Sequence, residues 1–403
     1  MLPELDIAPR DPEDVSPPEF YSDQGPRREI APMKITFLMP GYVWGPSGGA
    51  RVIYEYANQL VSRGHQVTLV HPRRCENSPN APFQFGVMGI LRGARNTQFK
   101  LREMFTKPPI SWQRLDARVH LEYVPSPDSR HIPDADAVFA TAWYTAAPVL
   151  DLPPAKGHKF YLIQGYETWM GSKPLVDETW RFPLHKIVVS QWLRRLGSDL
   201  GCGDIACVPN AIDHARYKIT RAVAGRRKQV AMMFSSVPLK GAIDGIRALE
   251  IARHRHPDLQ AVFFGAGRRQ SWLPRWVRYY RNPSQDFIVN EIYNGSQVFV
   301  SPSWEEGFSL PVAEAVACGC AIASTASGGV RDYIQDGVSG LLSQPKDPAA
   351  LADNLRLLLE NDGLRLKLAD AARASVNRLT WDSSAALLEV FVADNMNGIS
   401  RSS

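Results

Sequence analysis

The sequence predicts an α/β protein in which two doubly wound parallel sheets face a central cleft. Short apolar runs that suit buried strands alternate with segments whose apolar residues recur at helical spacing, as is typical of parallel sheets. The alternation occurs in two successive series, and 403 residues suffice for two or three domains of roughly 100–200 residues each. Because ligands of such folds bind beyond the carboxyl ends of the strands, the cleft between the sheets is the expected site.

An N-terminal tail precedes the first series. Residues 1–32 are rich in proline and acidic residues and have little periodic apolar content, which predicts disorder. A buried strand is expected at 34–39, followed by a glycine-containing loop at 41–49 and a helix that ends at the basic residue and glycine of 63–64. A strand at 66–70 completes a β-loop-α-β unit, which is the start of a Rossmann-like sheet.

Later elements extend both series. Further strands are expected at 137–140, 160–163 and 187–190, then at 229–235, 260–265, 297–301 and 320–323, with helices at 242–254, 286–293, 310–318, 348–360 and 363–376. The second series is expected to start near Ile205. We therefore expect two Rossmann-like domains, 33–205 and 206–382, with a boundary around 200–210.

Composition argues against several other classes of protein. Hydrophobic residues make up 44% and charged residues 22%, and no run approaches the ~18 apolar residues of a membrane-spanning helix. The net charge of +5 is too small to indicate nucleic-acid binding and suits an anionic small molecule or membrane surface. The N-terminus lacks the features of a secretory signal, and the five cysteines make no disulfide framework, so we expect a cytoplasmic protein.

The most informative stretch runs from Ser301 to Gly319. An apolar strand leads into a loop that carries Glu306, and a helix then starts near Pro311, a residue favoured at the first helical position. Glu314 lies in the first turns of that helix, whose N-terminus directs free amides toward the loop. Carboxylates in this position accept hydrogen bonds from sugar or ribose hydroxyls, although acidic residues are also common in the first turn of an ordinary helix.

This stretch resembles the retaining glycosyltransferases of family 4, which have the GT-B architecture. The family pattern places seven residues between two glutamates, and the chain reads Glu306-Gly-Phe-Ser-Leu-Pro-Val-Ala-Glu314-Ala-Val-Ala-Cys-Gly319. The similarity spans about 33–393 and includes Ser47-Gly-Gly-Ala50, Val208-Pro-Asn-Ala-Ile-Asp213, Leu239-Lys-Gly241, 327–334 and 336–341. In the family, a last helix crosses back to the first domain, which corresponds here to about 383–397.

The resemblance implies a donor site and a mechanism. Lys240 would neutralise the donor diphosphate, Glu306 would hold the donor sugar near its reacting carbon, and both count as catalytic. Glu314 would hold the ribose hydroxyls. The remaining donor contacts would come from Gly48, Gly49, Ser235, Gly307, Phe308, Ser309 and Leu310. The family retains anomeric configuration without a metal or other cofactor, and we expect front-face substitution with the leaving phosphate as the base.

One residue departs from the family pattern. The family usually places an arginine about five residues before its lysine, where this chain has Ser235 or Ser236. Arg51, Arg268 and Arg269 are candidates to supply the missing cation. Bacterial members that resemble rhamnosyltransferases share this substitution, which favours a deoxysugar donor.

Acceptor contacts are expected from loops of the first domain. Gln164 and Glu167 follow the strand at 160–163, and either belongs to the acceptor site or to an ordinary polar loop. Trp143 follows another strand, where its side chain either stacks on an acceptor sugar or packs in the core. Residues 90–107 mix basic and apolar side chains, as in a segment that lies on an anionic membrane, in a solvated helix or in an acceptor loop.

The expected function is transfer of a hexosyl or deoxyhexosyl group from a nucleoside-diphosphate sugar to a hydroxyl of a glycan, glycolipid or natural product. A role in polysaccharide biosynthesis, in the cytoplasm or on the inner face of the membrane, would fit. The alternatives are a catalytically silent nucleotide-sugar-binding subunit and another GT-B enzyme such as a nucleotide-sugar epimerase. Asp134-Ala-Asp136 has the spacing of a manganese motif, but it precedes a buried strand, and we expect no metal.

Overall fold

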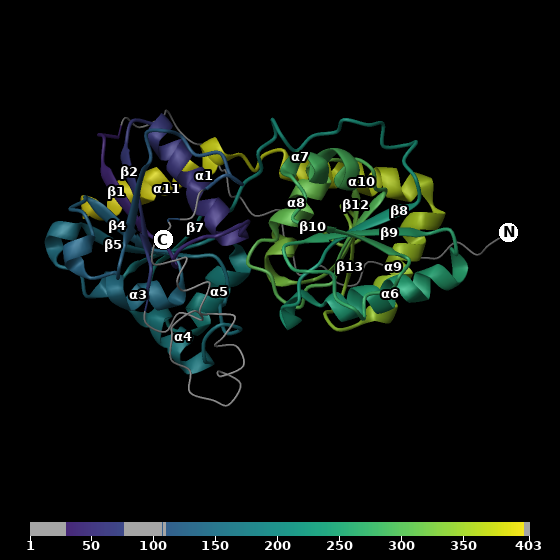
Figure 1. Cartoon of the computed structure of the whole chain (residues 1–403), viewed down its shortest axis with the longest axis horizontal. Coiled ribbons are helices and arrows are strands. Elements are labelled where there is room, and N and C mark those ends of the chain that lie inside the picture. Colours follow the sequence, from purple (N-terminus) through teal and green to yellow (C-terminus); the bar gives the residue numbers. More distant parts are fainter. Residues whose placement is uncertain (1–29, 76–106, 108–109, 399–403) are drawn as a thin grey trace.

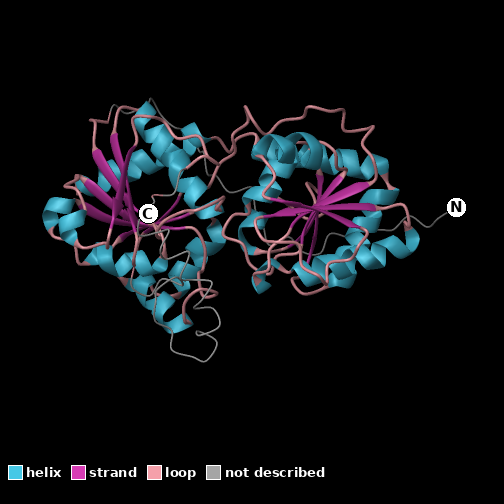
Figure 2. Cartoon of the chain, in the orientation of Figure 1, coloured by secondary structure: helices cyan, strands magenta, loops and turns pink. Residues whose placement is uncertain are grey.

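The computed structural model describes residues 30–75, 107 and 110–398. It consists of two α/β domains side by side, each with helices on both faces of a parallel sheet (Figures 1 and 2), which confirms the predicted fold class. The predicted tail, apart from 30–32, and the basic segment 90–107, apart from Lys107, lie outside the described residues.

The first domain contains a parallel sheet in the order β3-β2-β1-β4-β5-β6-β7. Its strands are β1 (Lys34–Leu38), β2 (Gln66–Pro72), β3 (His120–Val124), β4 (Ala137–Ala140), β5 (His158–Ile163), β6 (His185–Val188) and β7 (Ile205–Cys207). Phe37, Phe139 and Phe160 stack on neighbouring central strands and are fully buried. Their burial explains why these strands appear in the sequence as unbroken apolar runs, since helices cover both faces of the sheet.

Within the described residues, four helices of the first domain follow its strands. They are α1 (Gly48–Ser62), α3 (Trp143–Leu150), α4 (Lys173–Arg181) and α5 (Gln191–Asp199), with single turns η1 (Ser129–His131) and η2 (Pro154–Lys156). Ser47 caps α1, and its hydroxyl accepts a hydrogen bond from the Ala50 amide at 3.5 Å. This cap places the two glycines at the start of α1 directly beyond the end of β1.

The second domain contains a parallel sheet in the order β10-β9-β8-β11-β12-β13. Its strands are β8 (Gln229–Met233), β9 (Gln260–Gly265), β10 (Val277–Arg281), β11 (Val298–Ser301), β12 (Ala321–Thr325) and β13 (Leu341–Ser343). Its helices are η3 (Pro238–Lys240), α6 (Ala242–Arg255), α7 (Gln285–Phe287), the π-helical η4 (Ile288–Tyr293), α8 (Leu310–Ala317), η5 (Gly328–Asp332), α9 (Pro348–Glu360) and α10 (Asp362–Val376). Helices α6 and α9 cover one face, and α7, α8 and α10 cover the other (Figure 1).

The last helix, α11 (Trp381–Met396), packs on α1 of the first domain (Figure 1). Tyr56 of α1 and Trp381 meet edge to face, with ring centroids 5.4 Å apart. Arg63 and His65 both reach the Glu389 carboxylate, at 2.7 and 2.9 Å. The chain therefore crosses between the domains twice, which limits how they can separate.

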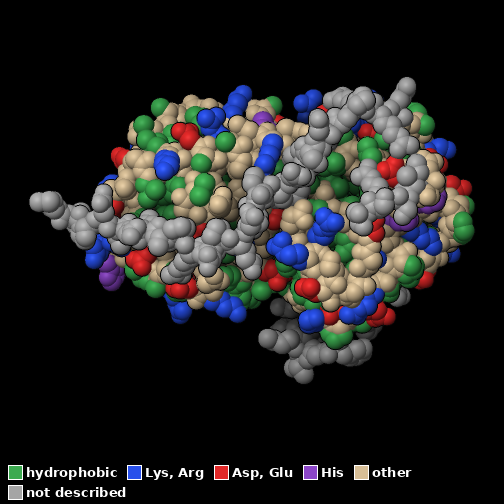
Figure 3. All heavy atoms as spheres, turned by 180° about the vertical axis from the view of Figure 1, so that it is seen from behind, with side chains coloured by type: hydrophobic (Ala, Val, Ile, Leu, Met, Phe, Trp, Pro, Cys, Tyr) green, Lys and Arg blue, Asp and Glu red, His purple; other side chains and the backbone are tan. Residues whose placement is uncertain are grey.

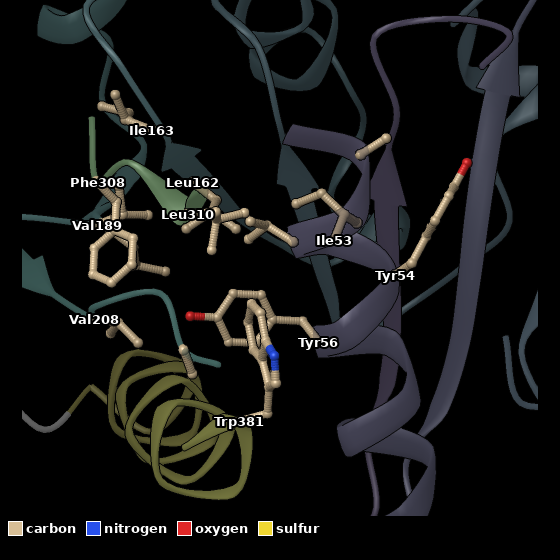
Figure 4. Packing of buried hydrophobic residues seen from close by; sticks show 14 of the residues in the cluster. Ile53, Tyr54, Tyr56, Leu162, Ile163, Val189, Val208, Phe308, Leu310 and Trp381 are labelled. Atoms are coloured by element: carbon tan, nitrogen blue, oxygen red, sulfur yellow. The ribbon is translucent and has the colours of Figure 1, made fainter. Parts of the chain in front are cut away.

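Packed side chains connect the domains directly. Phe308 and Leu310 of the second domain belong to the same buried cluster as Leu162 and Ile163 of the first (Figure 4). Charged side chains of both signs are scattered over both domains on the face shown in Figure 3. The domain contact thus includes an apolar cluster, while this outer face is mixed in charge.

Several element boundaries differ from the prediction. The expected boundary at 205/206 falls inside β7, and the second series does not start at Ile205, because that residue pairs with Lys186 of β6. The edge strands β3, β10 and β13 were not predicted, and β3 and β10 each contain only one buried residue, so neither forms an apolar run in the sequence. The helix expected at 286–293 is one α-helical turn followed by a π-helix.

Candidate functional site

A cavity of about 510 Å³ lies between the two domains at the carboxyl ends of their strands. Thr141 follows β4 and Gln164 follows β5 on the first-domain side, while Lys240 and Glu306 follow β8 and β11 on the other. The cavity therefore occupies the position that the topology of two facing parallel sheets predicts for a ligand.

Lys240 and Glu306 form an ion pair on the second-domain side of the cavity. The Lys240 Nζ lies 2.8 Å from Glu306 Oε2, and Ser303 Oγ donates to Glu306 Oε1 at 2.8 Å. The lysine side chain is 30% exposed and the glutamate side chain 9%. The lysine charge can thus reach a ligand in the cavity, while the glutamate is held in a fixed orientation by two partners.

The loop after Glu306 lies directly against the first domain. A Cβ on Gly307 would lie 1.8 Å from the Gln164 carbonyl oxygen, so only glycine fits there. Ser309 has a left-handed backbone, with φ of 71°, and begins α8. The Tyr333 hydroxyl donates to the Phe308 and Ser309 carbonyls at 3.1 and 2.9 Å, which supports this strained turn.

Two helix N-termini meet at the cavity. Gly48 and Gly49 begin α1, while Ser309 and Leu310 begin α8, and all four residues line the cavity. The side-chain amide of Gln164 donates to the Gly49 carbonyl at 3.1 Å, which links the α1 loop to the end of β5. Amides at helix N-termini favour anions, so these backbone groups, together with Lys240, can contact an anionic ligand in the cavity.

Glu314 does not line the cavity. It is 4% exposed, one carboxylate oxygen is paired with Arg51, and the other accepts from the Tyr293 hydroxyl at 3.0 Å. Arg51 also donates to the Tyr217 hydroxyl at 3.3 Å. The structure therefore places this glutamate, expected at the ribose, in an interdomain ion pair, and a ribose contact would require Arg51 to move.

Ser235 and the three arginines suggested as additional phosphate ligands do not line the cavity. Ser235 accepts from the Val237 amide at 3.2 Å and does not line the cavity. Arg269 donates to three carbonyls of its own loop, and Arg268 is exposed on that loop. Of the cavity-lining residues that the structure describes, Lys240 is the one Lys or Arg. None of the three suggested arginines therefore lies beside it as a second cation in this conformation.

Glu167 and Gln164 line the first-domain side of the cavity, but Trp143 does not. The Glu167 carboxylate accepts from the Trp143 backbone amide at 2.7 Å, and burial raises the pKa of Glu167 to about 7. The Trp143 side chain is only 4% exposed and packs against Gly171. Of the two roles considered for Trp143, the structure shows core packing.

Several residues that line the cavity were not predicted from the sequence. Tyr144, Tyr166 and Trp169 line the first-domain wall, and Trp169 is 53% exposed. Glu305 lines the opposite side, and burial raises its pKa, opposed by the charge of Lys240. The sequence does hold a signal for the residues of 165–169. The segment Gly165-Tyr-Glu-Thr-Trp169 places aromatic residues in a polar loop directly after a predicted strand.

Two facing parallel-sheet domains, with a cavity between their strand ends, define the GT-B class of glycosyltransferase folds. The family model described as Glycosyltransferase Family 4 matches residues 46–216, and the model described as Glycosyl transferases group 1 matches residues 218–375. The chain belongs to glycosyltransferase family 4.

A known protein of similar sequence agrees with this membership. A D-inositol 3-phosphate glycosyltransferase of Xylanimonas cellulosilytica is 44% identical over 100 residues, which are 25% of this chain and 24% of that protein. The chain matches less than half of the length of the curated relatives with this name.

Solved structures share the fold at low identity. The sucrose-phosphate synthase of Thermosynechococcus elongatus has a TM-score of 0.65 at 15% identity, covering 91% of this chain and 100% of that one. The Anabaena protein Alr3699/HepE, solved in complex with UDP-glucose, has a TM-score of 0.63 at 16% identity, covering 91% and 98%. Both support the GT-B fold for almost the whole chain.

Other candidate sites have ordinary structural roles. Asp134 pairs with Lys156 at 2.8 Å, and Asp136 accepts from the Lys34 backbone amide at 2.6 Å, so each aspartate anchors the entry to β4. Across residues 30–75, 107 and 110–398, no three His, Cys, Asp or Glu side chains cluster as metal ligands. Within the same ranges, no helix has the length and apolar character needed to cross a bilayer.

Proposed function

We propose that this protein transfers a hexosyl or deoxyhexosyl group from a nucleoside-diphosphate sugar to an acceptor hydroxyl. The observation that carries the proposal is the convergence of Lys240, Glu306 and the N-termini of α1 and α8 on one interdomain cavity. A cation and two helix N-termini suit a diphosphate, and an oriented carboxylate suits the sugar attached to it.

Lys240 and Glu306 have charges opposite to those that develop on the donor during the reaction. As the glycosidic bond breaks, negative charge grows on the diphosphate, and Lys240 stabilises it more in the transition state than in the ground state. Positive charge grows on the sugar ring at the same time, and Glu306, held by Lys240 and Ser303, is the carboxylate we assign to stabilise it. The backbone of Gly307, Phe308 and Ser309 then positions the sugar.

We further propose retention of anomeric configuration by front-face attack, without a metal ion. The leaving phosphate accepts the proton of the acceptor hydroxyl, so the step forms one glycosidic bond and breaks another. Uridine diphosphate is the first nucleotide to test, since the Anabaena structure holds UDP-glucose. A deoxyhexose remains a proposal that rests on Ser235 and Ser236 in place of arginine.

The proposed acceptor site is the first-domain wall. Trp169 offers an exposed ring face on which a sugar can stack, and Gln164 and Glu167 offer polar atoms for hydroxyls. A glycan, glycolipid or glycosylated natural product would fit this chemistry. Location in the cytoplasm or on the inner membrane face through 90–107 is likewise a proposal.

Melting temperatures in metal-free buffer test the donor assignment. Uridine, guanosine and thymidine diphosphate sugars are compared, because a ligand that binds only the folded state raises the melting temperature. We expect a shift with one nucleotide class that is lost in Lys240→Ala and kept in Lys367→Ala, whose lysine is exposed on α10.

Product analysis completes the test of the reaction. We expect release of the free nucleoside diphosphate and a product with the donor's anomeric configuration, measured by proton NMR. The absence of a shift with every donor would favour a silent subunit. Release of an epimerised sugar would favour an epimerase.

A further inference from the structure

A second cavity, of about 420 Å³, lies in the second domain away from the interdomain site. It shares no lining residue with the interdomain cavity and is lined by residues of β10, α7, η4 and the segment before β8. A neighbouring hollow of about 230 Å³ shares Val262 and Arg278 with it. The donor chemistry proposed above uses none of these residues.

The lining of this cavity is strongly basic. Its described charged residues are four arginines and one glutamate: Arg221, Arg226, Arg227, Arg278 and Glu291. Glu291 is paired with Arg221. Arg227 and Arg278 are exposed, and neither side chain has a hydrogen bond or ion pair to any residue within the described ranges. Two guanidinium groups are thus available to a ligand without breaking an existing pair.

Arg226 adds a buried charge without a carboxylate partner in the described part of the chain. It is 7% exposed and donates to four carbonyls and to the side-chain oxygen of Asn294. Its Nε has no hydrogen-bond partner within those residues. A buried guanidinium that is neutralised only by dipoles is costly, and an anion in the adjoining cavity would offset that cost.

The remaining walls suit a ligand of moderate size. Tyr280 and Phe287 pack together with ring centroids 4.7 Å apart and form an aromatic wall. In the neighbouring hollow, the Arg253 guanidinium lies 4.4 Å from the centre of the Trp276 ring. The cavity volume lies within the range of small-molecule sites, which is about 300–1,000 Å³.

We propose that this arginine-lined cavity binds a phosphate-bearing anion at a site separate from the donor cleft. The planar guanidinium groups of Arg227 and Arg278 would bind phosphate oxygens in the forked geometry that arginine favours. Arg221 would join them once it releases Glu291. A compound that carries an ionised phosphate, either a soluble phosphate ester or an anionic lipid headgroup, is the matching chemical class.

Calorimetric titration with inorganic pyrophosphate tests the proposal. The full chain carrying Lys240→Ala is used, so that the cation of the donor cleft is absent. We expect pyrophosphate to bind this protein and its affinity to fall at least tenfold when Arg227→Ala and Arg278→Ala are added. Arg255→Ala with Arg275→Ala, two exposed arginines that line neither cavity, is the matched control and should leave the affinity unchanged.

A further substitution tests whether the negative charge in the cavity weakens anion binding. Glu291→Gln removes the negative charge and frees Arg221, so it should strengthen pyrophosphate binding several-fold. The arginine and glutamate substitutions all change exposed side chains, and melting curves of every variant, the Lys240→Ala background included, report whether the fold is kept. Absence of binding in Lys240→Ala, or equal weakening by the two arginine pairs, would overturn the proposal.

Vesicle sedimentation separates the two possible sources of the anion. Vesicles of phosphatidylglycerol are compared with vesicles of neutral phosphatidylcholine. Binding to phosphatidylglycerol that is lost with Arg227 and Arg278 assigns the site to a lipid headgroup. Pyrophosphate binding without vesicle binding assigns it to a soluble phosphate compound.

Discussion

Arg51 of the first domain is paired with Glu314 of the second, and both side chains are largely buried. The pair joins α1 to α8, the two helices whose N-termini meet at the interdomain cavity. It therefore couples the relative position of the domains to the carboxylate that family resemblance assigns to the donor ribose.

Arg51→Ala should destabilise the protein. Removing one partner of a buried ion pair leaves the other charge buried alone, which costs about 3–5 kcal/mol. Urea unfolding should show a loss of that order, and adding Glu314→Gln should restore part of it because the unpaired charge is then removed. A loss below about 1 kcal/mol would show that the pair is solvated in solution.

Glu167 should make stability depend on pH. Its pKa is raised by burial from 4.5 to about 7, so the folded state binds this proton more tightly than the unfolded state. Relative to Glu167→Gln, the wild-type protein should lose stability as pH rises from about 4.5 through 7. The loss has an upper limit of about 3.5 kcal/mol, since a tenfold change in proton affinity is worth about 1.4 kcal/mol. Melting temperatures of both proteins at pH 5 and pH 8 measure the effect, and an unchanged difference between them would contradict it.

Gly307→Ala should prevent the observed domain contact. The added methyl carbon would overlap the Gln164 backbone carbonyl, which has no flexible side chain to move aside. We expect donor turnover to fall at least tenfold. Gly267→Ala, at a position with open space around it, should behave as wild type. Full activity of Gly307→Ala would mean that the domains do not need to meet as they do here.

Trp169→Ala should affect the acceptor and spare the donor. Loss of the stacking surface should raise the acceptor KM about tenfold while kcat and the donor KM stay nearly constant. Trp272→Ala, which removes a tryptophan of similar exposure from the second domain, is the control. Equal kinetic constants for Trp169→Ala and wild type would remove Trp169 from the acceptor site.

The sequence predicts the fold and the second-domain side of the cavity, because both rest on local signals. Apolar runs at β1, β4, β8 and β11 mark the central strands, and the loop after β11 carries Glu306 at a fixed distance from α8. The edge strands β3 and β10 lack that signal because solvent, rather than a second strand, meets one of their edges.

The return of the last helix to the first domain was predicted, but the individual side-chain contacts between the domains could not be predicted from sequence. The pairing of Arg51 with Glu314 joins positions 263 residues apart, and the burial of Trp143 depends on packing with Gly171. A side chain's direction at a strand end depends on such packing, which explains why Trp169 lines the cavity and Trp143 does not.

The rate of donor turnover in Lys240→Ala tests the central claim most directly. Single-turnover kinetics with the best donor, without added metal, would compare wild type, Lys240→Ala and Lys367→Ala. The account predicts that Lys240→Ala loses at least a hundredfold in rate, beyond any loss of donor affinity, because its charge acts most strongly in the transition state. Lys367→Ala should match wild type. Undiminished turnover by Lys240→Ala would contradict the assignment of the donor diphosphate to this cavity.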